Sequence, residues 1–171
     1  MQTSVIHTEN LTRDFGSLRA VNHISFEVAP GRIFGFLGPN GSGKTTTIRL
    51  LLGLIKPTSG TASVMGQDII KNPDEIRQVS GALLENTGLY ERLSARDNLE
   101  FYGRVWHISQ NERTQRMKEL LTSLDLWQRK DEVISGWSKG MKQKLAIART
   151  LFHRPQLIFL DEPTNGLDPV A

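Results

Sequence analysis

Residues 38–45 read Gly38-Pro39-Asn40-Gly41-Ser42-Gly43-Lys44-Thr45 and fill every fixed position of the Walker A pattern, a glycine-rich loop that binds phosphate. The apolar run 33–37 before this loop predicts a buried strand. The segment 46–55 after it carries isoleucine and leucine at helical spacing and predicts a helix. Because strand, loop and helix follow in the order that the motif requires, the stretch predicts binding of a nucleoside triphosphate.

The chemistry of this loop follows from its residue types. Glycines let backbone N–H groups turn toward phosphate oxygens, and the start of the helix adds a partial positive charge. Lys44 is expected to reach the β- and γ-phosphates, and Thr45 to bind Mg²⁺ through its hydroxyl. The alternative, a glycine-rich turn formed for packing alone, is disfavoured by the Lys-Thr pair and the flanking pattern. The expected nucleotide contacts are Gly38, Asn40, Gly41, Ser42, Gly43, Lys44, Thr45 and Thr46.

Composition narrows the class of protein. The chain has 171 residues, of which 38% are hydrophobic and 23% charged, enough for one globular domain with a core. It has no cysteine, which removes disulfides and thiolate metal sites and fits a reducing compartment. No apolar stretch reaches the length of a membrane span, so we expect the chain not to cross a membrane. The net charge is +3, but basic and acidic residues are interspersed, so we expect no nucleic-acid partner.

Hydrophobic patterning changes along the chain. Alternating residues predict half-buried antiparallel strands at 5–11 and 24–28, with a turn at 14–17. Shorter strands are expected at 61–64 and near 78–83. From about Ser94 the pattern becomes helical: a capping box opens a helix that ends near Trp106, and leucines after Met117 mark an amphipathic second helix. The three tryptophans, Trp106, Trp127 and Trp137, fall in this helical part and are expected to serve packing.

A second motif follows a buried apolar run at 157–160. Two acids, Asp161 and Glu162, stand where this predicted strand ends, which is the ligand edge of a parallel α/β sheet. This Walker B pattern predicts that Asp161 binds Mg²⁺ through a water and that Glu162 polarises the water attacking the γ-phosphoryl group. Lys44 and Glu162 are therefore the expected catalytic residues. The alternative, a strand ending in surface acids, is disfavoured by the accompanying Walker A loop.

A third stretch carries a family resemblance. Residues 137–143 read Trp137-Ser138-Lys139-Gly140-Met141-Lys142-Gln143 and precede a predicted helix, and Ser138 is a good N-cap. This stretch resembles the signature of ATP-binding cassette (ABC) ATPases, and residues 161–169 resemble their Walker B and D-loop. The resemblance covers the whole chain and is closest to the ATPase subunits of bacterial exporters for drugs and antibiotics.

The resemblance implies the fold and its division. The expected fold class is α/β, a P-loop NTPase with a RecA-like parallel sheet core, an N-terminal antiparallel β-subdomain and an inserted α-helical subdomain. One ABC ATPase domain would fill 1–171, with the β-subdomain and Walker A core in 1–84. The helical subdomain with the signature would be 85–150, and the Walker B and D-loop 151–171.

The resemblance also implies further site residues. Ser138 and Gly140 would bind the γ-phosphate held by a partner domain, so that two ATP molecules lie between two domains packed head-to-tail. Phe15 falls where the family places an aromatic residue that stacks on adenine. Glu85 falls at the Q-loop position, where its carboxylate would contact Mg²⁺ together with Thr45 and Asp161. Val21 either adds an apolar contact to the base or packs within its strand, and the second is favoured.

The sequence departs from the family pattern in two places. The signature has Trp137, Lys139 and Met141 where Leu, Gly and Gln are usual, while the phosphate-facing Ser138 and Gly140 are kept. The family pattern also continues beyond the D-loop into further strands and a switch histidine. All four histidines, His7, His23, His107 and His153, precede the Walker B strand. We therefore expect a C-terminally truncated chain with exposed apolar strand edges that hydrolyses ATP poorly or not at all alone.

The function implied is that of the ATP-binding and ATP-hydrolysing subunit of an ABC-type membrane exporter. The expected cofactors are ATP and Mg²⁺. The expected partners are a second ABC ATPase domain, in a homo- or heterodimer, and an integral membrane permease, with the chain cytoplasmic and peripheral at the inner face of the cell membrane. Two alternatives stay open: a soluble ABC-type ATPase that acts on ribosomes or nucleic acid, and a non-hydrolysing nucleotide-binding remnant.

Overall fold

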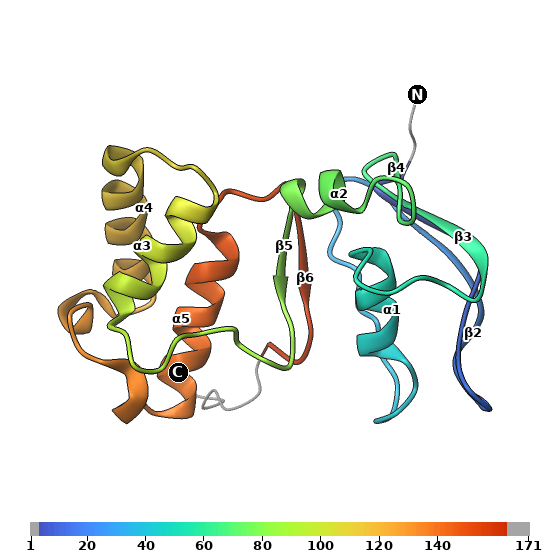
Figure 1. Cartoon of the computed structure of the whole chain (residues 1–171), viewed down its shortest axis with the longest axis horizontal. Helices are drawn as coiled ribbons and strands as arrows, with labels where there is room; N and C mark the ends of the chain where they lie inside the picture. The colour runs from blue at the N-terminus through green and yellow to red at the C-terminus, as the bar shows by residue number, and fades with distance from the viewer. Residues whose placement is uncertain (1–3, 164–171) are drawn as a thin grey trace. The chain divides into compact units, whose positions relative to one another are not determined.

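The computed structural model describes residues 4–163 and divides into two compact units, the first ending at Ser80 and the second beginning at Gly81. The first unit holds the four-stranded sheet, the phosphate-binding loop and the helices α1 and α2, and the second unit holds the helices α3, α4 and α5 (Figure 1). Residues 164–169 of the predicted D-loop lie outside the described residues. Within residues 4–163, no helix combines the length and apolar character needed to span a bilayer.

The sheet of the first unit is antiparallel. β1 (Ile6–Phe15) pairs on one side with β2 (Leu18–Val28) and on the other with β3 (Ser59–Val64), which continues to the short β4 (Gln67–Asp68). The order over the described residues is therefore β2-β1-β3-β4. This confirms the predicted antiparallel strands and their turn, although both strands extend further toward the turn than their alternating patterns indicate.

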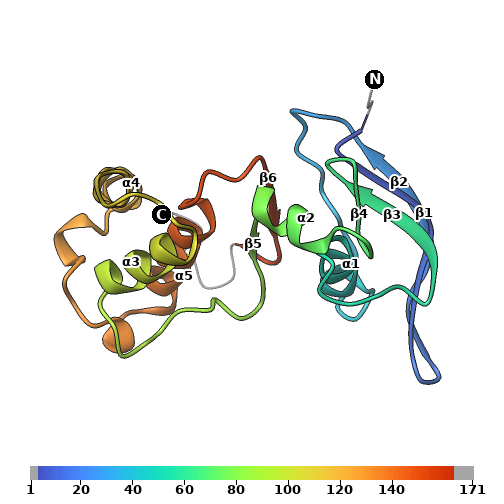
Figure 2. The same cartoon turned by 45° about the horizontal axis from the view of Figure 1, so that its top comes forward.

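Two helices complete the first unit. α1 (Lys44–Leu51) lies against one face of the sheet (Figure 2), and α2 (Pro73–Val79) leads into the second unit's first strand. α1 stops before the predicted residue 55 because Gly53 takes a left-handed φ of 63° and its N–H donates to the Leu50 carbonyl. The patterns above do not predict α2 or β4. The core of this unit is formed by Leu11, Val28, Leu50, Leu51, Val64 and Ile76.

The predicted buried strand at 33–37 is wrong. No described strand pairs with these residues, and Ile33 and Leu37 are 104% and 94% exposed. Phe34 and Phe36 instead gather beside Phe26 of β2, with ring centroids 5.2 Å apart for Phe26 and Phe34. An extended segment has no backbone hydrogen bonds of its own and forms a strand only beside a neighbour. The apolar pattern of 33–37 by itself therefore does not decide whether this segment pairs as a strand.

The second unit has a short two-stranded sheet over its described residues. β5 (Ser80–Leu83) pairs with β6 (Leu157–Leu160), and the Asp161 N–H donates to the Leu83 carbonyl at 2.8 Å. This bond joins the C-terminal ends of both strands, as a parallel pair requires. The predicted strand at 157–160 is confirmed, but only Phe159 is buried, since Ile158 and Leu160 are 42% and 46% exposed.

Between residues 81 and 163, three helices form the body of the second unit. They are α3 (Ala95–Val105), α4 (Gln110–Ser123) and α5 (Lys139–Leu151), with short 3₁₀ helices η1 (Trp127–Arg129) and η2 (Ile134–Gly136) between the last two. The Ser94 hydroxyl accepts from the Asp97 N–H at 3.0 Å, so the predicted cap of α3 is confirmed.

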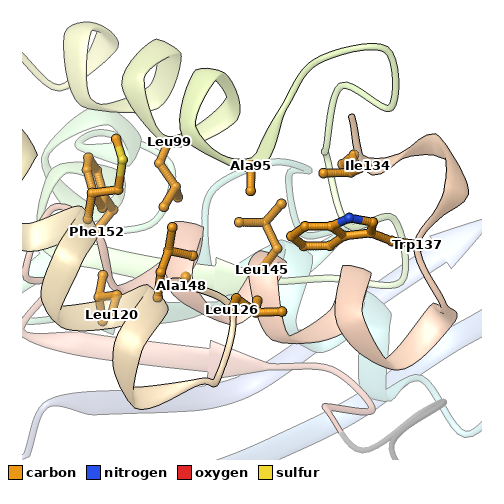
Figure 3. Packing of buried hydrophobic residues seen from close by; sticks show 11 residues of the cluster. Ala95, Leu99, Leu120, Leu126, Ile134, Trp137, Leu145, Ala148 and Phe152 are labelled. Carbon is orange, nitrogen blue, oxygen red and sulfur yellow. The ribbon is translucent and has the colours of Figure 1, made fainter. Parts of the chain in front are cut away.

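The three helices share one hydrophobic core. Its buried members include Leu99 of α3, Leu121 of α4 and Leu145 of α5, each fully buried. Figure 3 shows the Trp137 ring lying beside Leu145 in this cluster. Trp127 packs against the same cluster, and Trp106 stacks on His153 with ring centroids 4.1 Å apart. The packing role expected of the three tryptophans is confirmed.

Candidate functional site

The phosphate-binding loop ends in the helix start that its sequence predicts. Gly43 is the N-cap of α1 and takes φ 89°, and Gly41 takes φ 81°. A Cβ atom on Gly43 would lie 2.2 Å from the Ala20 carbonyl oxygen of β2, so only glycine fits at this crossing. A Cβ atom on Gly41 would meet no described atom within 4 Å. The loop is thus held against β2 at its end and open at its centre.

Lys44 folds back over this loop. Its Nζ donates to the carbonyl oxygens of Gly38 and Pro39, both at 2.8 Å, and the Ser42 N–H also donates to Pro39, at 3.2 Å. The first-turn N–H groups of a helix have no acceptor within the helix, so this end of α1 carries partial positive charge. A phosphate placed here would meet that charge and could accept from Lys44 in place of the two carbonyls. Asn40 and Ser42 are exposed, and Thr45 and Thr46 are half-buried in the first turn.

The two residues expected near the base differ in exposure. Phe15 is 45% exposed at the end of β1, with the Arg13 guanidinium 4.5 Å from its ring centroid. A cation already lies over one face of the ring, so stacking of adenine on Phe15 stays a prediction and would use the other face. Val21 is 4% exposed and lies next to Gly43, which favours the strand-packing interpretation of Val21.

The predicted acidic residues follow the ends of β5 and β6. Glu85 is exposed two residues after β5, Asp161 is 7% exposed immediately after β6, and Glu162 is exposed with φ 48°. The bond from the Asp161 N–H to Leu83 brings the two strand ends together. Glu85 and Asp161 therefore follow the same edge of a parallel pair, where ligands bind in open α/β sheets.

Two of the predicted metal ligands, Thr45 and Asp161, are of residue types that Mg²⁺ accepts as ligands. Residues 4–163 contain no group of three or more His, Asp or Glu side chains placed to hold a metal ion. Mg²⁺ usually takes one or two carboxylates together with phosphate oxygens and waters rather than an all-protein cage. Thr45 and Asp161 fit that requirement by residue type. They belong to different units, since Thr45 lies before Ser80 and Asp161 after Gly81.

The signature stretch opens α5 as expected. Ser138 is the N-cap, and its hydroxyl accepts from the Met141 N–H at 3.2 Å. Ser138 is exposed and Gly140 is half-buried, so both are accessible at the helix start. This end of α5 presents a hydroxyl and backbone N–H groups with the partial positive charge of a helix N-terminus, which suits an anion.

The sequence patterns give Gln143 and Glu132 no role. The Gln143 side chain is 7% exposed, and its Nε2 donates to the Pro163 carbonyl at 3.0 Å, which ties α5 to the segment that follows Asp161. Glu132 accepts from the Trp137 indole N–H. Gln143 lies opposite the apolar face of α5, so spacing does not reveal it. The tryptophan itself is the one sequence signal for Glu132, because a buried indole N–H needs an acceptor.

Comparison with known proteins agrees with this geometry. A family model described as ABC transporter matches residues 21–165. The chain therefore belongs to the ABC transporter family, and its fold is the P-loop NTPase fold of that family's ATP-binding subunits, as the sequence predicts.

Two curated relatives are ATP-binding proteins of ABC or bacitracin transport. The bacitracin transport ATP-binding protein BcrA of Bacillus licheniformis is 45% identical over 99% of this chain and 54% of its own length. The ABC transporter ATP-binding protein NatA of Bacillus subtilis is 40% identical over 88% of this chain and 62% of its own. The chain thus spans about half to three fifths of these two curated relatives.

Two solved structures are similar over nearly the whole chain. The ATP-binding subunit of an ABC transporter has a TM-score of 0.87 at 30% identity, covering 98% of this chain and 70% of that one. The cbiO1 protein of Clostridium perfringens, part of the ABC transporter complex cbiONQ, has a TM-score of 0.85 at 26% identity, covering 99% and 69%.

Proposed function

We propose that the chain is part of the ATP-binding and ATP-hydrolysing subunit of an ABC-type membrane exporter. The observation that carries this proposal is the phosphate-binding loop, in which Gly43 starts α1 and the Lys44 ammonium lies over the loop at 2.8 Å from two carbonyl oxygens. ATP would bring the phosphoryl group to be transferred, and Mg²⁺ would neutralise charge on its phosphates.

The residues of this loop bind and orient the phosphates. Lys44 would exchange its two neutral carbonyl acceptors for anionic phosphate oxygens, so that donor and acceptor would both be charged. Thr45 would offer a hydroxyl to the metal ion, and the backbone N–H groups of Gly38 and of residues 40–46 would bind phosphate oxygens. Phe15 offers a ring face to the base, and Val21 supports the loop from beneath Gly43.

The acidic residues of the second unit provide the hydrolytic part of the proposed site. Asp161 would hold the metal ion, and Glu85 would add a second carboxylate from the neighbouring strand end. Glu162 orients and polarises the attacking water. Its exposed position immediately after Asp161 supports this assignment.

Ser138 and Gly140 act in a partner domain's site. An exposed N-cap hydroxyl at the start of α5 can donate to a γ-phosphate across a head-to-tail dimer interface. The transport subunit would then be peripheral at the inner face of the cell membrane, joined to a membrane permease. The names of the relatives support this arrangement, since one is a bacitracin transport protein and another is part of the complex cbiONQ.

Competition for a fluorescent ATP analogue tests the nucleotide-binding part. Lys44→Ala is expected to weaken ATP binding by about tenfold or more, since it removes a charged hydrogen bond worth roughly 1.5–3 kcal/mol. The matched control is Lys71→Ala, an exposed lysine of the same unit that is outside the loop. Equal ATP affinity in wild type and Lys44→Ala, or no binding by wild type, would contradict the proposal.

Phosphate release from the whole transporter complex tests the hydrolytic part. Glu162→Gln is expected to bind ATP normally and to lose turnover, because the amide cannot polarise the attacking water. Normal binding with no phosphate release by wild type would favour the non-hydrolysing alternative. Recovery of ribosomes or nucleic acid, and no membrane permease, with the native protein would favour the soluble alternative.

A further inference from the structure

The signature departs from the usual pattern at Trp137, and the structure shows what this residue requires. Its side chain is 6% exposed and packs in the core of the second unit beside Ile134 and Leu145 (Figure 3). An indole fills more of this core than the usual leucine, but it also brings one N–H donor. A buried donor without an acceptor is costly, so the position needs a partner that a leucine would not.

Glu132 supplies that acceptor. The Trp137 Nε1 donates to Glu132 Oε2 at 3.2 Å, and the Arg129 Nε donates to the two Glu132 oxygens at 3.1 and 2.9 Å. The hydrogen bonds from Arg129, aided by the one from Trp137, hold the pKa of the Glu132 carboxyl below its ordinary value. The ionised carboxylate of Glu132 therefore accepts hydrogen bonds from both Arg129 and the Trp137 indole.

Arg129 reaches a second departure from the pattern. Its Nη1 lies 3.4 Å from Sδ of Met141, which stands where the family has Gln. The Met141 N–H in turn donates to the Ser138 hydroxyl. Glu132 thus contacts the indole of Trp137, which precedes Ser138. Arg129 contacts the thioether of Met141, which follows Ser138.

We propose that Glu132 and Arg129 are positioning residues that hold Ser138 in the orientation needed for the γ-phosphate, and that Trp137 and Met141 make them necessary. This inference rests on the proposed function, in which Ser138 contacts the phosphate of a partner domain. Glu132 and Arg129 would act through Trp137 and Met141 and would not touch the nucleotide themselves.

The test compares four variants of the native protein. Glu132→Ala removes the acceptor, and Glu132→Gln keeps an oxygen for the indole N–H. The double variant Trp137→Leu with Glu132→Ala removes donor and acceptor together. Glu119→Ala is the matched control. Glu119 pairs with Arg116 at an N–O distance of 2.8 Å and at the same i,i+3 spacing as Glu132 with Arg129, and it is outside this network.

Three measurements are made on each variant: ATP affinity of the phosphate-binding loop, ATP turnover of the transporter, and hydrogen exchange of the Met141 amide. Glu132→Ala is expected to leave ATP affinity unchanged, to lower turnover by about tenfold, and to speed exchange at Met141. Glu132→Gln and the double variant are expected to recover most of the turnover and the slow exchange. Glu119→Ala is expected to behave as wild type.

The outcomes separate this inference from the proposed function. Unchanged exchange and turnover in Glu132→Ala would overturn the inference and leave the ATPase assignment standing. Failure of the double variant to recover the Met141 exchange would overturn it as well, because the requirement would then not come from Trp137. If wild type does not hydrolyse ATP, the proposed function fails, and the exchange data still decide whether Glu132 orders the start of α5.

Discussion

The segment 33–37 and the core of the helical unit both carry strongly apolar residues, yet the structure buries only the second. Ile33 and Leu37 are 104% and 94% exposed, whereas Leu121 and Leu145 are fully buried. The difference lies in where each finds its neighbours. α3, α4 and α5 lie within about sixty residues of one another in the sequence and pack together, whereas no described strand pairs with 33–37.

Backbone hydrogen bonding explains why the helices and the extended segment 33–37 differ in burial. A helix satisfies its own N–H and C=O groups and needs partners only for its side chains. A strand needs a neighbour for both backbone and side chains. Hydrophobic pattern is therefore a good guide to burial in the helical unit and a poor one beside the phosphate-binding loop.

The largest loss of stability is expected for Leu145→Ala in the helical unit. Removing a fully buried leucine should lower the free energy of unfolding by about 2–5 kcal/mol. The matched change Ile33→Ala in the first unit should cost less than about 0.5 kcal/mol, since that side chain is already in water. Urea unfolding of the 171-residue chain followed by circular dichroism measures both. Equal losses would show that the side chains of 33–37 are packed in a core as those of the helical unit are.

An intermediate effect is expected in the first unit at Gly43. Gly43→Ala should lower the free energy of unfolding by about 2–4 kcal/mol, because its left-handed φ is unfavourable for alanine and the new Cβ would meet the Ala20 carbonyl at 2.2 Å. Gly41 also has a left-handed φ, but a Cβ atom there would meet no described atom within 4 Å. Gly41→Ala should therefore cost about 1 kcal/mol. Thermal unfolding compares the two. A smaller loss for Gly43→Ala than for Gly41→Ala would show that the loop does not press on β2.

The smallest effect concerns an ion pair between two helices of the second unit. Arg113 of α4 donates to both carboxylate oxygens of Glu100 of α3, at 2.8 and 2.9 Å. These bonds, with a smaller contribution from Arg104, hold the pKa of Glu100 below its ordinary 4.5. Because the pKa of Glu100 is lower in the folded than in the unfolded state, the carboxylate stabilises the fold at pH values above the unfolded-state pKa. This stabilisation is lost as the pH falls through the folded-state pKa.

Glu100→Gln tests this pair. It should lower the free energy of unfolding at pH 7 by about 1 kcal/mol, and the difference from wild type should shrink as the pH falls below 4.5. The Glu119 side chain is 56% exposed, so Glu119→Gln should cost less at every pH. Urea unfolding at a series of pH values gives the comparison. A difference that stays constant into acid would mean that the Glu100 charge does not stabilise the helical unit.

Local chemistry allowed several features to be predicted from the sequence. Ser94 and Ser138 are helix caps because a serine hydroxyl can accept from an N–H three residues ahead, whatever the rest of the chain does. The phosphate-binding loop is predictable for the same reason, since its glycines and Lys44 act on their immediate neighbours. The family follows from such local motifs in a fixed order.

Contacts between distant residues were decided only by the tertiary structure. The exposure of Ile33, the cation over Phe15 and the acceptor that Glu132 offers to Trp137 each depend on which elements meet in space. The loop, the caps and the order of the motifs can be read from the sequence alone, because a few neighbouring residues satisfy their hydrogen bonds. Burial and the partners of buried polar groups were left to tertiary structure, because they require surfaces and acceptors from elsewhere in the chain.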